Sequence, residues 1–212
     1  MKRFYILIAA AFMLSVSTSA SAQFMTTSGS GNNAVIGAFK TFWLSYAPTN
    51  FKVDNISESG ANTFSLGITS ANPLSGSPFY YEYGAYVDWL NDTEKDSGYT
   101  GAVNMIGIKA PLNLMYPFDF ADNIILYPYA GIHAKGFIIA NASAKYDGEK
   151  ETINLYDEDS DLKRFALGYQ IGIRARFPSF IVGVGYEDLL TSIVDGENSK
   201  INSITISLGF PF

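Results

Sequence analysis

The chain has 212 residues, a formal net charge of −6, and a composition of 48% hydrophobic, 15% aromatic and 16% charged residues. Because it contains no cysteine, disulfide scaffolds, thiolate metal sites and thiol catalysis are excluded. The acidic balance argues against a nucleic-acid partner, since no basic excess is present to meet phosphates. The hydrophobic content also excludes intrinsic disorder, so the composition belongs to a folded protein that is unusually poor in charge.

The N-terminal residues are typical of an exported protein. Two basic residues precede an apolar run, Phe4–Val16, and the small residues Ala20-Ser21-Ala22 follow as an A-x-A cleavage site. This pattern predicts a secretory signal peptide over residues 1–22, because the run is shorter than the ~20 apolar residues of a spanning helix. Residues 23–36 are rich in Ser, Thr, Gly and Asn and are expected to form a flexible periplasmic lead segment. Residues 37–212 remain as one domain.

The domain alternates between strand-like runs and turn-rich breaks. Apolar and polar residues exchange places with a period of two, which indicates strands with two different faces. No segment shows a convincing helical period, so the fold class is all-β. About eight such runs are expected: Phe39–Ala47, Asn62–Ala71, Phe79–Asn91, Gly101–Tyr116, Asn123–Asn141, Arg164–Phe177, Phe180–Thr191 and Lys200–Phe212.

The breaks between the runs alternate in length and charge. The first, third, fifth and seventh are longer and acidic, whereas the others are shorter. An antiparallel up-and-down meander places all odd connections at one end, so this pattern predicts a closed transmembrane β-barrel with long loops on one side. The four longer connections are Pro48–Ala61, Asp92–Thr100, Ala142–Lys163 and Ser192–Ser199.

The two faces of the strands differ in chemistry. One face is apolar throughout, as at Ile171 and Ile206, and the other carries glycines and charged groups. In a membrane barrel the apolar face meets lipid and the second face shares a narrow lumen, where opposite charges can pair. We therefore predict a lumen charge network. Its members are Glu82, Asp88, Lys109, His133, Lys135, Arg174, Arg176 and Glu187.

Two other functions compete with this interpretation. A secreted or periplasmic soluble β-barrel or sandwich that binds a small apolar ligand would point Leu112, Ile171 and Ile206 inward. A lipid-modifying outer-membrane enzyme would have to use His133, the only histidine. No matching serine motif lies near His133, so we favour a lumen histidine hydrogen-bonded to a carboxylate such as Glu82 or Asp88, and a protein that is not an enzyme.

Cofactor and metal motifs are weak. The acidic segment Tyr156–Asp161 lacks the central glycine and closing glutamate of an EF-hand loop, and is expected to be a solvated surface segment. There is no Walker motif and no convincing dinucleotide fingerprint. We therefore predict no catalytic residue, no cofactor and no bound metal.

The C-terminus resembles the signal of Gram-negative outer-membrane barrels. Alternate residues are apolar up to the terminal phenylalanine: Ile204, Ile206, Leu208, Phe210 and Phe212. The stretches Ile108–Tyr116 and Tyr127–Gly131 are similar to paired strands of the small outer-membrane protein β-barrel domain family, often labelled porin family.

The resemblance implies an eight-stranded monomeric barrel in the bacterial outer membrane, inserted by the outer-membrane assembly machinery. Both termini would lie in the periplasm, and lipid and lipopolysaccharide would surround the barrel. Side chains fill the interior of a barrel of this size, and an open porin would need about sixteen strands. The expected role is structural, adhesive or surface-interacting through the long acidic extracellular loops, with no partner identified.

Overall fold

The computed structural model describes residues 37–212, apart from 54–55, 97–98, 147–148, 158–160 and 197–198. The predicted signal peptide, residues 1–22, and the predicted lead segment, residues 23–36, lie outside the described residues. The described part of the chain contains no helix that is long and apolar enough to cross a membrane.

The described residues form strands that close into a ring. Neighbouring strands are antiparallel, and β1 pairs with both β2 and β10, which closes the sheet on itself. The short strands β5 and β7 each pair only with β6, where they continue the courses of β4 and β8. The strands are β1 (Phe39–Val53), β2 (Ile56–Pro73), β3 (Tyr80–Asp96), β4 (Tyr99–Met115), β5 (Phe118–Ala121), β6 (Ile124–Tyr146), β7 (Glu149–Asn154), β8 (Phe165–Arg176), β9 (Ile181–Leu189) and β10 (Ser199–Pro211).

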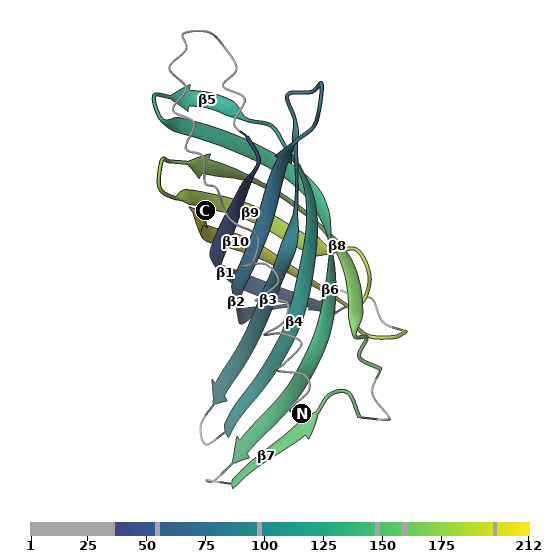
Figure 1. Cartoon of the computed structure of the whole chain (residues 1–212). Helices are drawn as coiled ribbons and strands as arrows, with labels where there is room; N and C mark the ends of the chain where they lie inside the picture. Colours follow the sequence, from purple (N-terminus) through teal and green to yellow (C-terminus); the bar gives the residue numbers. More distant parts are fainter. Residues whose placement is uncertain (1–36, 54–55, 97–98, 147–148, 158–160, 197–198) are drawn as a thin grey trace, which may run out of the picture.

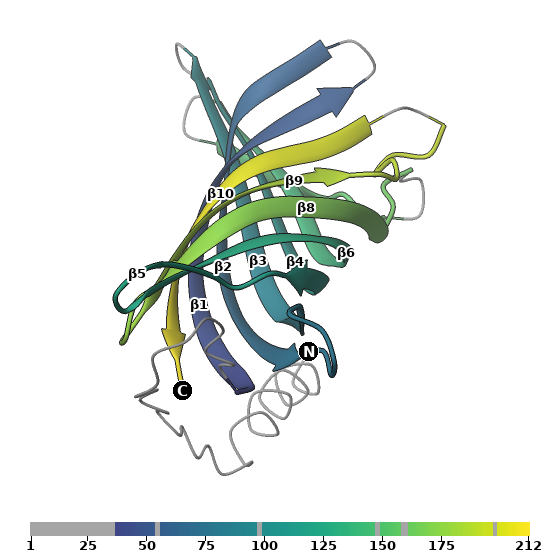
Figure 2. The same cartoon turned by 90° about the horizontal axis from the view of Figure 1, so that it is seen from above.

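The ring order is β1-β2-β3-β4-β6-β8-β9-β10, followed by β1 again (Figures 1 and 2). The predicted fold class, a closed antiparallel up-and-down barrel of eight strands, is confirmed. Short connections lie at one end, the turn end, where Gly76 and Asn123 adopt positive φ values of 73° and 67°. The C-terminal residue lies at this end too, since the Phe212 amide donates to the Lys40 carbonyl.

The other end, the loop end, differs from the prediction. The expected loops Pro48–Ala61 and Asp92–Thr100 are mostly strand, because β1 runs to Val53 and β3 runs to Asp96. With β4, β6 and β7, strand β3 projects beyond the barrel (Figure 1). The hydrophobic period of two disappears where both strand faces meet water, although the backbone pairing continues, so sequence pattern alone ended these strands too early.

The outside of the barrel is an apolar belt. Ile171 is 54% exposed and Ile206 is 56% exposed, so both point outward, opposite to the requirement of a soluble ligand-binding barrel. At the loop end the belt finishes in one cross-strand row, whose aromatic members contact each other at ring distances of 5.2 and 6.0 Å. This rim row consists of Tyr46, Phe64, Trp89, Ile106 and Ile139.

The inside of the barrel has three layers. At the turn end, Tyr80, Met115 and Tyr127 form a buried cluster. A polar layer occupies the middle. At the loop end, a second apolar cluster is built around buried residues such as Leu90, Phe137 and Ile201, and segments following β7 and β9 pack onto it. Because side chains fill both ends, the polar layer is enclosed.

Candidate functional site

The polar middle layer holds most of the predicted charge network. These side chains occupy alternate, inward positions of β3, β4, β6, β8 and β9, as the period of two requires. All of the predicted members except Arg176, which is half-buried, are buried. Apart from His133 and Arg176, they separate into two groups of contacts, one centred on Glu82 and the other on Glu187.

The first group joins β3 to β8 across the lumen. Arg174 Nη1 lies 2.5 Å from Glu82 Oε2, and Asn113 Nδ2 donates to Glu82 Oε1 at 2.9 Å. The Arg174 guanidinium also lies 4.5 Å from the Trp43 ring centre and 4.4 Å from that of Tyr129. The cation is therefore held between two aromatic faces and a carboxylate inside the lumen.

Glycines make room for this arrangement. A Cβ built on Gly172 or Gly185 would collide with the Tyr129 side chain, and at Gly172 it would also collide with the backbone of β9. The absence of side chains at these two positions lets Tyr129 lie flat against the wall beside Arg174. These two lumen glycines thus allow the Tyr129 side chain to approach the barrel wall closely.

The second group joins β4, β6 and β9. Glu187 accepts from Lys109 Nζ at 2.9 Å, from Lys135 Nζ at 2.7 Å and from the Ser203 hydroxyl at 3.1 Å. Lys135 also lies 3.6 Å from Asp88 Oδ2, so two cations face two carboxylates in a nearly dry interior. Mutual pairing offsets the desolvation cost that each buried charge carries.

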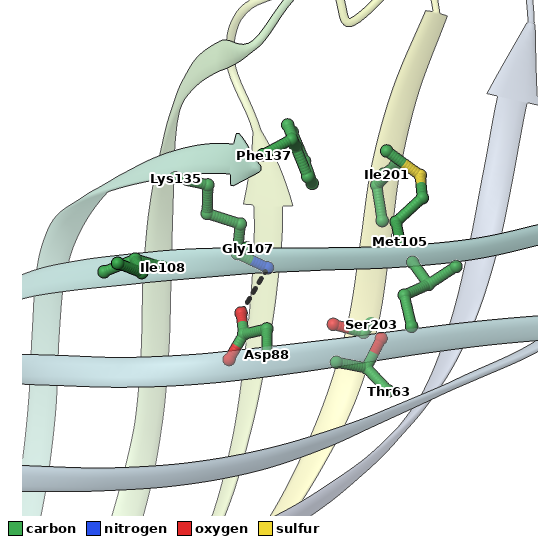
Figure 3. A pocket seen from close by; sticks show the side chains of 10 residues that line it. Thr63, Asp88, Met105, Gly107, Ile108, Lys135, Phe137, Ile201 and Ser203 are labelled. Atoms are coloured by element: carbon green, nitrogen blue, oxygen red, sulfur yellow. Dashed lines mark ion pairs between the residues drawn. The ribbon is translucent and has the colours of Figure 1, made fainter. Parts of the chain in front are cut away.

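A small cavity separates this second group from the apolar layer. Its volume is about 20 Å³, which is room for roughly one water molecule. Figure 3 shows the Asp88–Lys135 ion pair on one side of the cavity, with Met105, Phe137 and Ile201 on the other. A cavity of about 30 Å³ lies beside Arg174 and Glu187. Both are far smaller than the 300–1,000 Å³ of typical ligand pockets.

Two predicted residues stand apart. His133 is buried, but its two ring nitrogens have no hydrogen-bond partner among the described residues, so the expected bond to Glu82 or Asp88 is wrong. The ring lies against Gly168, where an added Cβ would collide with Nε2. Arg176 lies 4.3 Å over the Phe39 ring at the turn end and makes no ion pair with any described carboxylate.

The sequence pattern missed several polar members of the layer. Thr69 and Asn113 hydrogen-bond to Glu82, and Gln170 donates to Asn113 at 2.6 Å. Their inward parity was readable from the sequence, but an uncharged residue gives no sign of its partner. Trp43 and Tyr127 also lie inside the barrel. Aromatic residues occur both inside the barrel and on its outer surface, so composition alone does not show on which side an aromatic residue lies.

The C-terminal residues close the barrel. The outward side chains of β10 are exposed, and its backbone pairs with β1 as far as Pro211 opposite Thr41. These outward residues are Ile204, Ile206, Leu208 and Phe210, followed by the exposed terminal Phe212. Within the described ranges there is no cluster of three or more His, Asp or Glu residues that could hold a metal. Residues 158–160 of the acidic segment Tyr156–Asp161 lie outside these ranges.

No protein-family model matches this sequence, and a search of curated proteins found no match. Among solved structures, Ail, the attachment invasion locus protein of Yersinia pestis crystallised with the heparin analogue sucrose octasulfate, is similar with a TM-score of 0.51 and 15% identity. The match covers 84% of this chain and all of Ail (100%). Neisserial surface protein A matches with a TM-score of 0.47 and 18% identity, over 84% of this chain and 100% of that one.

The outer membrane enzyme PagL matches with a TM-score of 0.47 and 12% identity, over 81% of this chain and 99% of that one. At such identities a likeness concerns the fold. The class is defined by the closed ring, the outward belt and the Ail likeness: this chain has the fold of the small eight-stranded outer-membrane β-barrels, as the resemblance implied.

Proposed function

We propose that this protein is an integral β-barrel of the bacterial outer membrane that acts at the cell surface and conducts no solutes through an open pore. The apolar belt carries the proposal, because a closed barrel whose large aliphatic side chains point outward is stable only where lipid covers them. The signal peptide predicted over residues 1–22, the lead segment predicted over 23–36 and the C-terminal pattern ending at Phe212 support export and recognition by the assembly machinery.

The surface available for recognition is the sheet that projects from the loop end. Strands β3, β4, β6 and β7 form it, and its inward face carries carboxylates at both edges: Asp92 and Glu94 on β3, Glu149 and Glu151 on β7. Ail was crystallised with a polyanion. An acidic face repels polyanions, so we infer that the inward face here binds a cationic partner, such as a basic segment of another protein.

A structural or adhesive role fits the interior better than catalysis. His133 is enclosed, and no hydroxyl hydrogen-bonds to it among the described residues, whereas acyl transfer needs a nucleophile within reach of its base. The two cavities beside the ion pairs, of about 20 and 30 Å³, support a barrel that works through its exposed sheet rather than through its lumen.

The experiment is expression of the full chain in a Gram-negative host, followed by fractionation and electrophoresis of unheated and boiled samples. We expect the protein in the outer-membrane fraction, with faster migration when unheated, and lacking residues 1–22 by mass spectrometry. Recovery in the soluble periplasm without detergent would overturn the proposal. Conductance measurements in planar bilayers should show no porin-sized steps.

A further inference from the structure

The sheet that projects at the loop end (Figure 1) leaves apolar side chains on its inward face open to solvent. Val103 of β4 packs against the buried apolar cluster of the loop end, so the residues in register with it face inward. Ile153 of β7 belongs to this inward set and is 54% exposed, and Tyr146 of β6 also belongs to it and is 71% exposed. Contiguous apolar surface that the fold leaves open is typical of an interaction site.

This inward face has a floor of small or apolar residues between two acidic edges. Each of two successive cross-strand rows begins with a carboxylate on β3 and continues with glycine, alanine or valine on β4 and β6. The edge on β7 carries Glu151 and, two residues away, Glu149. We call this surface the acidic-edged strip. Its first row is Asp92, Val103, Ala142 and Ile153, and its second row is Glu94, Gly101, Ala144 and Glu151.

The edge carboxylates of the strip have no counter-ion among the described side chains. None of the four forms an ion pair with a described residue. Lys145 and Lys150 are close in the chain, but they alternate with the inward residues of β6 and β7 and therefore lie on the outward face. Two edges of the same sign create a negative potential over the strip between them. A complementary partner carries positive charge along both of its sides.

The spacing of the two edges selects the shape of that partner. Three strand-to-strand steps separate β3 from β7, which is about 14 Å. An α-helix with its side chains is about 10–12 Å across, so a helix that lies along the strip faces both edges at once. Along β6, the distance from Ala142 to Tyr146 is about 14 Å, which corresponds to roughly nine residues of helix.

An extended segment fits the strip less well. Inside the strip, β4 and β6 are paired on both sides, so they offer no free backbone groups to an added strand. An extended segment would pair with the free edge of β7 and would lie beside Glu149 and Glu151 alone. Gly101 also favours a helix on the floor, because a glycine within a strand marks a place where another backbone approaches closely.

We propose that the acidic-edged strip binds an amphipathic α-helix of a partner protein, with an apolar stripe flanked on both sides by lysine or arginine. The stripe packs on Val103, Ala142 and Ile153, Tyr146 supplies an aromatic anchor, and the two basic flanks face the two acidic edges. This inference rests on the proposed function, because it requires the loop end to be accessible at the cell surface. It specifies the form of the cationic partner inferred there.

The test uses the full-length protein in phosphatidylcholine nanodiscs, with empty nanodiscs as the blank. The probe is a fluorescent peptide of about 18 residues, long enough to form a helix, with a leucine and alanine stripe between two rows of lysine. D92N/E94Q and E149Q/E151Q should each weaken binding by about fivefold, the loss expected from two exposed ion pairs. A peptide with a central proline keeps its charge but loses its helix, and should bind the wild-type protein about tenfold more weakly.

Three results would overturn the inference. Absence of peptide binding would remove the site, and equal binding of the proline peptide would show that only charge is recognised. A loss confined to E149Q/E151Q would indicate an extended segment at the edge of β7. The comparison of the two peptides on the wild-type protein remains decisive if a variant does not fold, which unheated electrophoresis reports.

A charge-matched control separates position from net charge. D119N/D122N removes two exposed carboxylates at the turn end and should leave the peptide affinity within about twofold of wild type, because salt screens charges at that distance. A fivefold loss in this control would refute the assignment of binding to the strip. A protein that is soluble without detergent would refute the proposed function itself, whereas an inserted barrel that does not bind the helical peptide would refute this inference alone.

Discussion

The Glu187 carboxylate is the most informative place to perturb the barrel interior. It lies on β9 and accepts hydrogen bonds from Lys109 and Lys135, at 2.9 and 2.7 Å. All three side chains are nearly inaccessible, with 7%, 7% and 11% relative exposure for Glu187, Lys109 and Lys135. The substitution Glu187→Gln keeps the shape of the side chain but leaves two lysines with only Asp88 as a nearby carboxylate.

The expected cost follows from desolvation. Removing one partner of a buried ion pair costs about 3–5 kcal/mol, because the remaining charge has neither water nor a counter-ion. Asp88 lies 3.6 Å from Lys135 and retains part of the balance, so we expect Glu187→Gln to lower the free energy of unfolding by about 3 kcal/mol. The double variant Glu187→Gln, Lys109→Met restores the charge balance and should recover much of this loss.

Urea unfolding of the barrel in detergent micelles, followed by tryptophan fluorescence and by the gel shift on heating, measures both values. Asp195→Asn is the matched control, because Asp195 pairs with Lys163 at 2.9 Å while their side chains are 74% and 43% exposed. We expect no measurable loss in the control. If Glu187→Gln unfolds at the same urea concentration as the control, or if the double variant is less stable than the single one, the argument that lumen charges stabilise by mutual pairing is wrong.

The remaining predictions concern the wall, the histidine and the loop end. Gly172→Ala should slow or prevent folding, because the added Cβ meets the backbone of β9, whereas Gly136→Ala, with open space at that position, should fold normally; refolding yields by gel shift check both. Expression of the wild-type protein should leave the lipid A of the host strain unchanged by mass spectrometry, and so should expression of the His133→Ala variant. A change in lipid A that the wild-type protein causes and the His133→Ala variant abolishes would reveal an enzyme. Lys163 holds the pKa of Asp195 below its usual range through a hydrogen bond and charge attraction. A carboxyl group whose pKa is depressed stabilises the folded state when the pH is above its ordinary pKa of about 3.9, and this stabilisation is lost as the pH falls below that value. Proteolysis of the segment after β9 should therefore increase only under acidic conditions.

Much of the barrel wall could be predicted from the chain alone. Alternation assigned Ile171 and Ile206 to one face and Glu82 and Arg174 to the other, because a strand places successive side chains on opposite sides. The outward orientation of the first pair is confirmed. The alternating connections also indicated one end with tight turns. These features depend on local pattern, and a period of two survives whatever the neighbouring strand is.

Which side chains contact each other across the lumen was decided only by the closure of the barrel. Arg174 and Glu82 are 92 residues apart, and their contact depends on barrel diameter, strand tilt and register together. The same holds for His133, whose inward parity was evident but whose lack of a hydrogen bond to any described carboxylate was not.

Register also decided the loop end. The sequence contains Lys145 and Lys150 as two separate charges in a presumed loop, and only the β6–β7 ladder places them opposite each other on the outward face. A slip of one residue would turn either side chain to the inward, acidic side. The sequence by itself therefore determined which residues share a face, because that property is local. The tertiary structure determined which of them meet, because closing the sheet sets a register that no single strand contains.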